Sequence, residues 1–196
     1  MNDRFSDDRF SGVSLWLVPP QKERNALRKV IDSIAKEHHS DAFDPHSTLA
    51  SLSSGTPREG WPDAIAAQLQ HHGPILATFD KVRPGNTFFH SVLADIKWDE
   101  KLFAFKADVI ASITQGLAPD PKLRPDWYPH VSFFYGNPPQ TVKEAIVRTL
   151  EATRDEETCT IDQIKQFEAN EVWIVQTDGQ VNEWRVLDKV KAPAAA

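Results

Sequence analysis

The sequence predicts an α+β fold, in which antiparallel sheets carry helices on one side. Two observations favour this class. Segments with helical periodicity alternate with short apolar strands, but strand pairs joined by turns stand between them, so the order is not the strict alternation of a parallel sheet. Glycine contributes only 8 of 196 residues, and neither GxGxxG nor GxxxxGK[ST] occurs, which disfavours the folds that bind phosphate in a glycine-rich loop.

The expected strands are short apolar runs, rich in β-branched or aromatic residues and bounded by turn residues. One pair of runs is joined by a turn at Pro84-Gly85-Asn86, and the second run of that pair contains His90. A later hairpin is expected to turn at Asp178-Gly179. The expected strands cover residues 13–18, 46–52, 75–85, 86–96, 130–136, 159–167, 171–177 and 181–187.

Four segments are expected to form helices. The first follows Pro19 and Pro20, which can open a helix because a first-turn residue needs no amide donor. It carries a single apolar stripe at the i, i+3, i+4 spacing of an amphipathic helix. The stripe consists of Leu27, Val30, Ile31, Ile34, Ala35 and His38. The other three helices are expected over residues 62–73, 100–116 and 142–150.

The length of 196 residues suits one domain with a substantial core. We expect a flexible N-terminus over residues 1–12, one two-lobed domain over 13–190 and a flexible tail over 191–196. The single cysteine, Cys159, excludes an internal disulfide and a cysteine-based zinc cluster. No apolar run approaches the roughly 18 residues of a membrane span, and the first residues lack the apolar stretch of a secretory signal. We therefore expect an intracellular, cytoplasmic protein without a membrane partner, and the sequence leaves association with endomembranes open.

The net charge of the chain indicates which classes of partner it can bind. The chain carries 22 basic and 28 acidic residues, a net charge of −6. A protein that binds long nucleic acid normally carries a concentrated basic surface, so that partner is disfavoured. A small phosphate-bearing substrate is still compatible with this balance, and we expect a monomer.

Two short segments of the sequence repeat one pattern 84 residues apart. Residues 45–49 read Pro-His-Ser-Thr-Leu, and residues 129–133 read Pro-His-Val-Ser-Phe. Because side chains alternate along a strand, His46 and Thr48 are expected to share one face, as are His130 and Ser132. Seven histidines would give roughly one His-x-Ser/Thr by chance, and His38-x-Ser40 at a helix end is interpreted as such a match. The other two share a proline and a strand context, so we interpret them as a functional pair.

Two histidines and two hydroxyls suit transfer at a phosphodiester. One imidazole near neutral pKa can deprotonate water while the other protonates the leaving oxygen. The hydroxyls can bind the nonbridging oxygens, where charge develops. This chemistry needs no metal or other cofactor, and no HExxH or similar ligand motif is present. The same residues could also belong to a binding module that captures nucleotides without turnover.

Residues 14–17, 45–49 and above all 129–136 (Pro-His-Val-Ser-Phe-Phe-Tyr-Gly) resemble the 2H phosphoesterases. This superfamily is defined by two His-x-Thr/Ser tetrapeptides on two pseudo-symmetric lobes. The similarity spans roughly Val13 to Leu187 and is greatest to the fungal and plant cyclic nucleotide phosphodiesterases. It implies two lobes, each an antiparallel sheet backed by helices, with an active-site cleft between them.

The resemblance also implies an activity. Enzymes of that family open 2′,3′-cyclic nucleotides to 2′-phosphates, and they open ADP-ribose 1″,2″-cyclic phosphate, a by-product of tRNA splicing. The catalytic pair maps onto His46 and His130, and the phosphate-binding hydroxyls map onto Thr48 and Ser132. Ser47 departs from the pattern, since an apolar residue usually stands there. An RNA-end enzyme of the same superfamily, ligase-like or 3′-trimming, is the alternative.

Two aromatic residues are further substrate-binding candidates. Tyr135 matches a substrate-contacting tyrosine of the plant enzymes, but by strict alternation it faces away from His130. It reaches the site only if the strand ends or bulges there. Trp127 precedes the second motif, in a proline-rich loop, and could stack on a base. His90 lacks a hydroxyl at the right spacing, and we interpret it as a structural strand residue.

Overall fold

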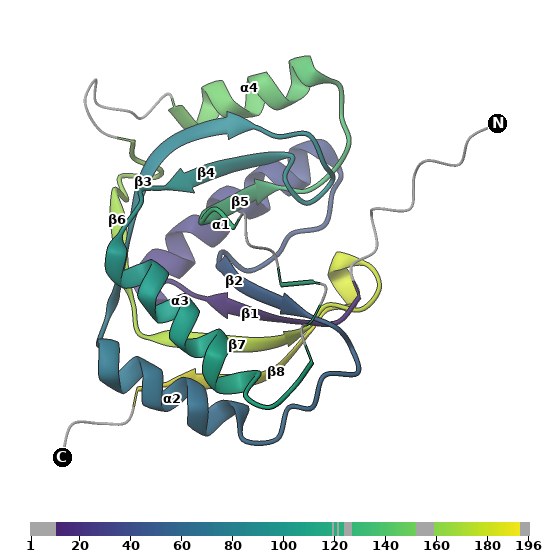
Figure 1. Ribbon diagram of the computed structural model, residues 1–196. Helices are drawn as coiled ribbons and strands as arrows, with labels where there is room; N and C mark the ends of the chain where they lie inside the picture. Colours follow the sequence, from purple (N-terminus) through teal and green to yellow (C-terminus); the bar gives the residue numbers. More distant parts are fainter. Residues whose placement is uncertain (1–10, 119, 121, 124–126, 152–158, 193–196) are drawn as a thin grey trace.

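Two four-stranded antiparallel sheets form the computed structural model, which describes residues 11–118, 120, 122–123, 127–151 and 159–192 (Figure 1). The first sheet has the strand order β2-β1-β7-β8 and the second β5-β4-β3-β6. The strands of the first sheet are β1 (Val13–Leu17), β2 (Ser47–Leu52), β7 (Glu171–Gln176) and β8 (Arg185–Lys191). Those of the second are β3 (Ile75–Pro84), β4 (Val92–Ile96), β5 (His130–Phe134) and β6 (Gln166–Ala169).

Helices lie against both sheets, so the predicted α+β class is confirmed. They are α1 (Gln21–His38), α2 (Trp61–His72), α3 (Glu100–Ile113) and α4 (Gln140–Glu151). Helix α4 contacts β3 and β4, and α1 contacts β5 of the same sheet. Helix α2 packs beside α3 and contacts β8 of the other sheet (Figure 1). As the periodicity predicts, α1 buries Leu27, Ile31 and Ile34.

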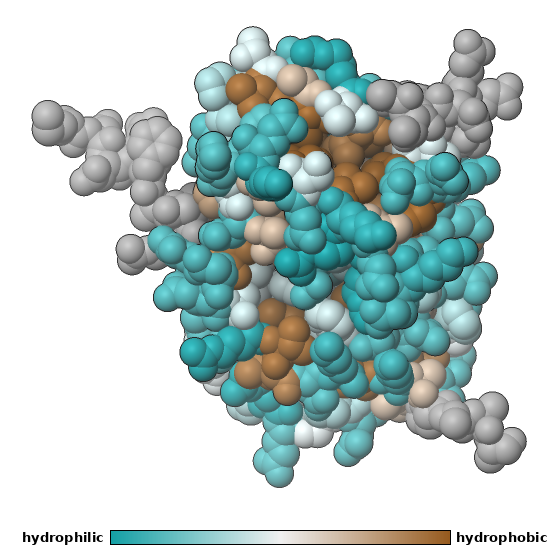
Figure 2. All heavy atoms as spheres, turned by 180° about the vertical axis from the view of Figure 1, so that it is seen from behind, coloured by the Kyte–Doolittle hydropathy of each residue, from teal (hydrophilic) through white to brown (hydrophobic). Residues whose placement is uncertain are grey.

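The two faces of β1 explain how the first sheet serves both the core and the site. Leu15 and Leu17 are fully buried in the main hydrophobic core. Because side chains alternate along a strand, Trp16 points to the opposite face. There it joins a smaller apolar cluster with Trp173 and Val175 of β7. From the side opposite to Figure 1, polar side chains cover much of the surface and apolar ones show in separate patches (Figure 2).

The chain between β3 and β4 differs from the prediction. A strand was expected to begin at residue 86, but β4 begins at Val92 and residues 87–91 form a turn. The Gly85 N–H donates to the carbonyl of Ser91, which closes this loop. Gly85 is required there, because a Cβ at this position would collide with the backbone carbonyl of His90. His90 is therefore a turn residue, and its interpretation as a strand residue is wrong.

Three further segments differ from the prediction near the C-terminus. The chain from Cys159 makes only an isolated bridge between Ile161 and Ile164 before β6. After β7 it does not turn directly into a strand, because the 3-10 helix η1 (Val181–Glu183) intervenes. Strand β8 continues to Lys191, one residue beyond the expected domain end. The expected flexible ends fall mainly on residues 1–10 and 193–196, which lie outside the described residues.

Candidate active site

The first half-site is built on β1 and the start of β2. The His46 ring stacks on Trp16, with ring centroids 3.6 Å apart and an interplanar angle of 6°. Trp16 pairs with Thr48 across the two strands, so His46, Trp16 and Thr48 gather on one face. The His46 Nδ1 lies 2.6 Å from the carbonyl oxygen of Asp44. A carbonyl can only accept, so Nδ1 carries the proton and Nε2 of the neutral ring keeps its lone pair.

The second half-site is built on β5, which begins at His130. The His130 Nδ1 lies 3.1 Å from the carbonyl oxygen of Tyr128, so its Nε2 also carries the lone pair in the neutral ring. His130 pairs in register with Asp95 of β4, which sets a carboxylate beside it on the same sheet. Ser132 follows two residues later, and its hydroxyl donates to the carbonyl of Phe89 over 3.1 Å.

The two half-sites lie next to each other where the sheets meet. Strands β2 and β5 contact each other although they belong to different sheets. A charge on His130 would act directly on His46 and lower its pKa. The structure thus brings the two predicted histidines together from positions 84 residues apart in the chain.

Burial holds both imidazoles neutral. Desolvation lowers the pKa of His46 to about 3, while its hydrogen bond to Asp44 acts in the opposite direction. Desolvation lowers the pKa of His130 to about 4, and here Asp95 favours the protonated form while His90 and Arg83 disfavour it. Both rings are therefore unprotonated at neutral pH in the free protein.

The hydroxyls of the two half-sites differ in their partners. Among the residues that the structure describes, the Thr48 hydroxyl has no hydrogen-bond partner, whereas its carbonyl accepts from the indole of Trp127. The Ser132 hydroxyl interacts with both Phe89 and Tyr135. Thr48 can therefore bind a ligand oxygen without first losing a protein contact, and Ser132 cannot.

Strand β5 ends at Phe134, so the strict alternation of side chains along the strand does not extend to Tyr135. Its ring stacks on Phe43 at 3.8 Å, and its hydroxyl hydrogen-bonds with Ser132. Burial raises the pKa of this phenol, so it stays protonated. Trp127 has its N–H committed to Thr48, and its ring contacts Phe103 at 5.1 Å.

A model of the family described as "Cyclic phosphodiesterase-like protein" matches residues 11–192. The chain belongs to the cyclic phosphodiesterase-like family. The resemblance to the 2H phosphoesterases is confirmed, and this cyclic phosphodiesterase-like protein is accordingly a phosphoesterase of that superfamily. No curated protein is similar enough in sequence to match it.

Solved structures are similar to this chain over most of its length. Escherichia coli LigT complexed with 3′-AMP has a TM-score of 0.55 and 12% identity, covering 93% of this chain and 98% of LigT. The apo form of the same protein gives a TM-score of 0.53 and 11% identity, covering 94% and 98%. Kluyveromyces marxianus Usb1 has a TM-score of 0.45 and 12% identity, covering 96% and 99%. The LigT structures support the two-sheet fold of the cyclic phosphodiesterase-like protein.

Sequence reasoning missed two residues beside the predicted site. His90 lies with its ring 4.9 Å from that of His130, because residues 87–91 form a turn rather than a strand. Trp184 follows η1 and contacts Trp16 at 5.8 Å and Tyr135 at 6.0 Å. Its indole nitrogen is buried without a hydrogen-bond partner among the described residues. A Pro-Gly pair followed by polar Asn86 and Thr87 was the available signal for the turn at His90; nothing local indicated Trp184.

The part of the chain that the structure describes offers neither a metal-ligand cluster nor a membrane-spanning helix. Over the described ranges, no group of three or more histidine, cysteine, aspartate or glutamate side chains could hold a metal ion. None of the described helices is long and apolar enough to cross a membrane.

Proposed function

We propose that this protein hydrolyses the cyclic phosphate of small nucleotides. It opens 2′,3′-cyclic nucleotides to nucleoside 2′-phosphates, and ADP-ribose 1″,2″-cyclic phosphate to ADP-ribose 1″-phosphate. The observation that carries this proposal is the pair of half-sites. Two neutral imidazoles, each fixed by a carbonyl at Nδ1, lie together with a hydroxyl beside each.

In the proposed reaction, Nε2 of His46 takes a proton from water as the oxygen attacks phosphorus. The bond from phosphorus to the 3′ oxygen breaks, and Nε2 of a protonated His130 gives its proton to that oxygen. The assignment of His130 as the acid rests on Asp95, which favours the charged form of His130 and has no counterpart among the groups that act on His46. Binding of the anionic phosphate favours the same protonation, because an opposite charge raises the pKa of a histidine.

The hydroxyls of Thr48 and Ser132 are proposed to donate to the nonbridging oxygens. Tyr135 positions Ser132 through its own hydroxyl, and Trp127 supports the backbone at Thr48. A small substrate agrees with the net charge of −6. The E. coli LigT structure that shares this fold contains 3′-AMP, which supports a nucleotide as the ligand.

The decisive experiment is a panel of 2′,3′-cyclic nucleotides and ADP-ribose 1″,2″-cyclic phosphate, assayed in excess EDTA with 2′- and 3′-phosphate products resolved. We expect turnover to persist and the nucleotide products to be 2′-phosphates. Loss of activity with chelator and its recovery with zinc or manganese would overturn the metal-independent mechanism.

Two other outcomes correspond to the alternative functions. Preference for an RNA end, with activity that falls steeply as salt rises, would indicate an RNA-end enzyme. Binding of nucleotides without turnover of any cyclic phosphate would indicate a binding module.

A further inference from the structure

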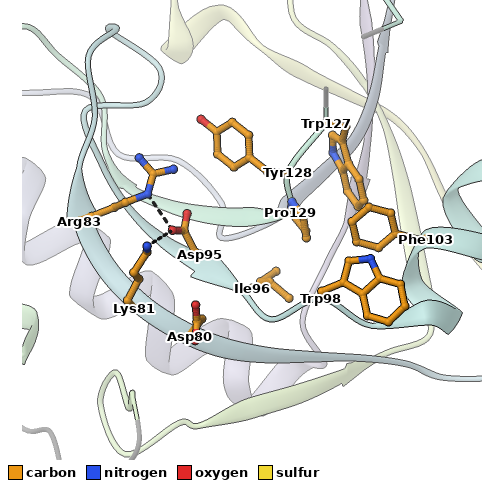
Figure 3. A pocket seen from close by; sticks show the side chains of 10 residues that line it. All are labelled: Asp80, Lys81, Arg83, Asp95, Ile96, Trp98, Phe103, Trp127, Tyr128 and Pro129. Atoms are coloured by element: carbon orange, nitrogen blue, oxygen red, sulfur yellow. Dashed lines mark hydrogen bonds and ion pairs between the residues drawn. The ribbon is translucent and has the colours of Figure 1, made fainter. Parts of the chain in front are cut away.

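A hollow of about 460 Å³ opens over β3, β4 and the residues before β5 (Figure 3). Pro129, one of its lining residues, directly precedes His130 in the chain. The volume of the hollow falls in the range of small-molecule sites. Strands β3 and β4, the start of α3 and the residues before β5 form its walls. The residues important here are Lys81, Arg83, Asp95, Trp98, Trp127 and Tyr128.

Two residues that neighbour His130 also line the hollow. Asp95 lines it and pairs in register with His130. Tyr128 also lines it, and its carbonyl oxygen accepts from the His130 Nδ1. The ring of Tyr128 is 5.0 Å from the ring of His130 and is 41% exposed. These shared neighbours place the hollow next to His130, on the side toward which a ligand with its phosphate at His130 would extend.

One side of the hollow is aromatic. Trp98 is 70% exposed, which is unusual for so large an apolar side chain. Its ring lies 5.8 Å from Phe103, which in turn contacts Trp127 at 5.1 Å. The Lys106 ammonium lies 4.4 Å from the centroid of the Trp127 ring and makes a cation–π contact with it. Exposed aromatic faces of this kind accept nucleobases irrespective of their identity.

The opposite side is charged but balanced (Figure 3). Arg83 Nε lies 2.7 Å from the Asp95 carboxylate, and Lys81 Nζ lies 3.9 Å from it. Asp80 adds a second carboxylate to the lining. Two cations offset by two carboxylates do not form a phosphate track, but they offer donors and acceptors to the polar edge of a base or to ribose hydroxyls.

We propose that this hollow is a subsite for a second nucleoside of the substrate, whose base stacks on Trp98. The proposal rests on the proposed function, because the cyclic phosphate is placed at His46 and His130. Two substrates carry such a nucleoside. One is a dinucleotide that ends in a 2′,3′-cyclic phosphate. The other is ADP-ribose 1″,2″-cyclic phosphate, in which a pyrophosphate links the adenosine to the ribose that carries the cyclic phosphate. Both place a base beyond the sugar that carries the cyclic phosphate.

The test compares adenosine 2′,3′-cyclic phosphate, ApA ending in a 2′,3′-cyclic phosphate and ADP-ribose 1″,2″-cyclic phosphate. Trp98→Ala should lower kcat/KM for one or both of the longer substrates roughly tenfold and leave the mononucleotide unchanged. Which longer substrate responds identifies the linkage that the subsite accepts. Trp98→Phe should retain most of the selectivity, and Leu187→Ala, another exposed apolar residue, is the control. An equal effect of Trp98→Ala on all three substrates, or none on any, would overturn the proposal.

Equilibrium binding separates this proposal from the proposed function. ApA, ADP-ribose and adenosine 2′-phosphate, none of them cyclic, would be titrated into the wild-type and Trp98→Ala proteins by calorimetry. We expect ApA, ADP-ribose or both to bind roughly tenfold more weakly to the variant, and adenosine 2′-phosphate to bind both proteins equally. If the wild type turned over no cyclic phosphate but this selective weakening occurred, the subsite would stand and the hydrolase proposal would fall. If turnover occurred and Trp98→Ala changed neither binding nor turnover selectively, the subsite would fall.

Discussion

The half-site around His46 and the half-site around His130 contain the same residue types in different surroundings. His46 is 5% exposed and covered by the full face of Trp16, whereas His130 is partly buried and touches His90 and Tyr128 at an angle. A carboxylate neighbours His130. These surroundings make His46 the harder of the two to protonate.

The hydroxyls of the two half-sites also differ, and here the second half-site is the more constrained one. Thr48 is unengaged among the described residues, whereas Ser132 is already held by Phe89 and Tyr135. The first half-site thus has a closely packed base and an available donor, and the second has a more open acid and a restrained donor. The two copies of the motif therefore do not have equal roles. The pKa of each histidine and the hydrogen bonds of each hydroxyl depend on neighbouring residues that differ between the two half-sites.

The largest expected effect is the loss of either histidine. His46→Ala and His130→Ala should each lower kcat by roughly 10²–10⁴-fold, because each removes one proton-transfer step. The double variant should be little worse than the more damaging single variant, since the two groups act together. Steady-state rates on a 2′,3′-cyclic nucleotide measure this.

The pH dependence of the wild type checks the same pair. The rate should follow a bell-shaped profile, because one imidazole must be neutral and the other protonated. The optimum of kcat/KM should lie below that of kcat, since burial lowers both pKa values in the free protein and bound phosphate raises them. Full additivity together with a flat profile between pH 5 and 8 would contradict the paired mechanism.

The hydroxyls should give a smaller and unequal effect. Thr48→Val, which keeps the shape of the side chain, should lower kcat roughly 10²-fold, as expected for a lost transition-state donor. Ser132→Ala should cost about tenfold, because its proton is directed at Phe89 and must reorient to serve the substrate. Thr149→Val on the exposed face of α4 is the matched control. A greater loss with Ser132→Ala than with Thr48→Val would reverse the comparison between the half-sites.

The smallest expected effect is on stability. Below the ordinary histidine pKa of 6.5, both histidines are protonated in the unfolded chain. In the folded protein, the buried rings of His130 and His46 stay neutral down to about pH 4 and about pH 3. The free energy of unfolding should therefore fall as pH decreases through this window, by up to about 1.4 kcal/mol per pH unit for each histidine.

Replacing both histidines should weaken this dependence of the free energy of unfolding on pH. Urea unfolding of His46→Gln/His130→Gln at pH 7, 6 and 5 should give a shallower fall than the wild type. His71→Gln, at an exposed position of α2, is the control. Identical slopes in wild type and double variant would show that burial of the rings does not contribute.

The parts of the fold that sequence could predict are those set by local pattern. The stripe through Leu27 and Ile31 predicts which face of α1 is buried, because helical periodicity alone decides it. The alternation of His130 with Ser132 likewise predicts that the two share a face of β5.

The parts that sequence could not predict depend on contacts between distant segments. Phe88 and Phe89 are residues typical of a strand, but the hydrogen bond from Gly85 to Ser91 closes this segment into a turn and brings His90 to His130. Trp184 reaches Trp16 only because η1 separates β7 from β8. The pairing of the histidines was expected from the two motifs, whereas the difference between their surroundings was not.

The position of β1 has a consequence for the order in which the molecule folds. This strand lies between β2 and β7, and Val13 pairs with Gln176. Trp16, on which His46 stacks, therefore gains its second neighbouring strand only near the end of the chain. During synthesis, both histidines and both hydroxyls emerge well before β7 does, yet the sheet that supports the first half-site still has an open edge. The lobe that contains His46 is thus completed last although its first strand is made first. A nascent chain that ended before Glu171 would carry every proposed catalytic residue and all four strands of the second sheet, but it would lack β7 and β8 of the sheet that supports His46 and Thr48.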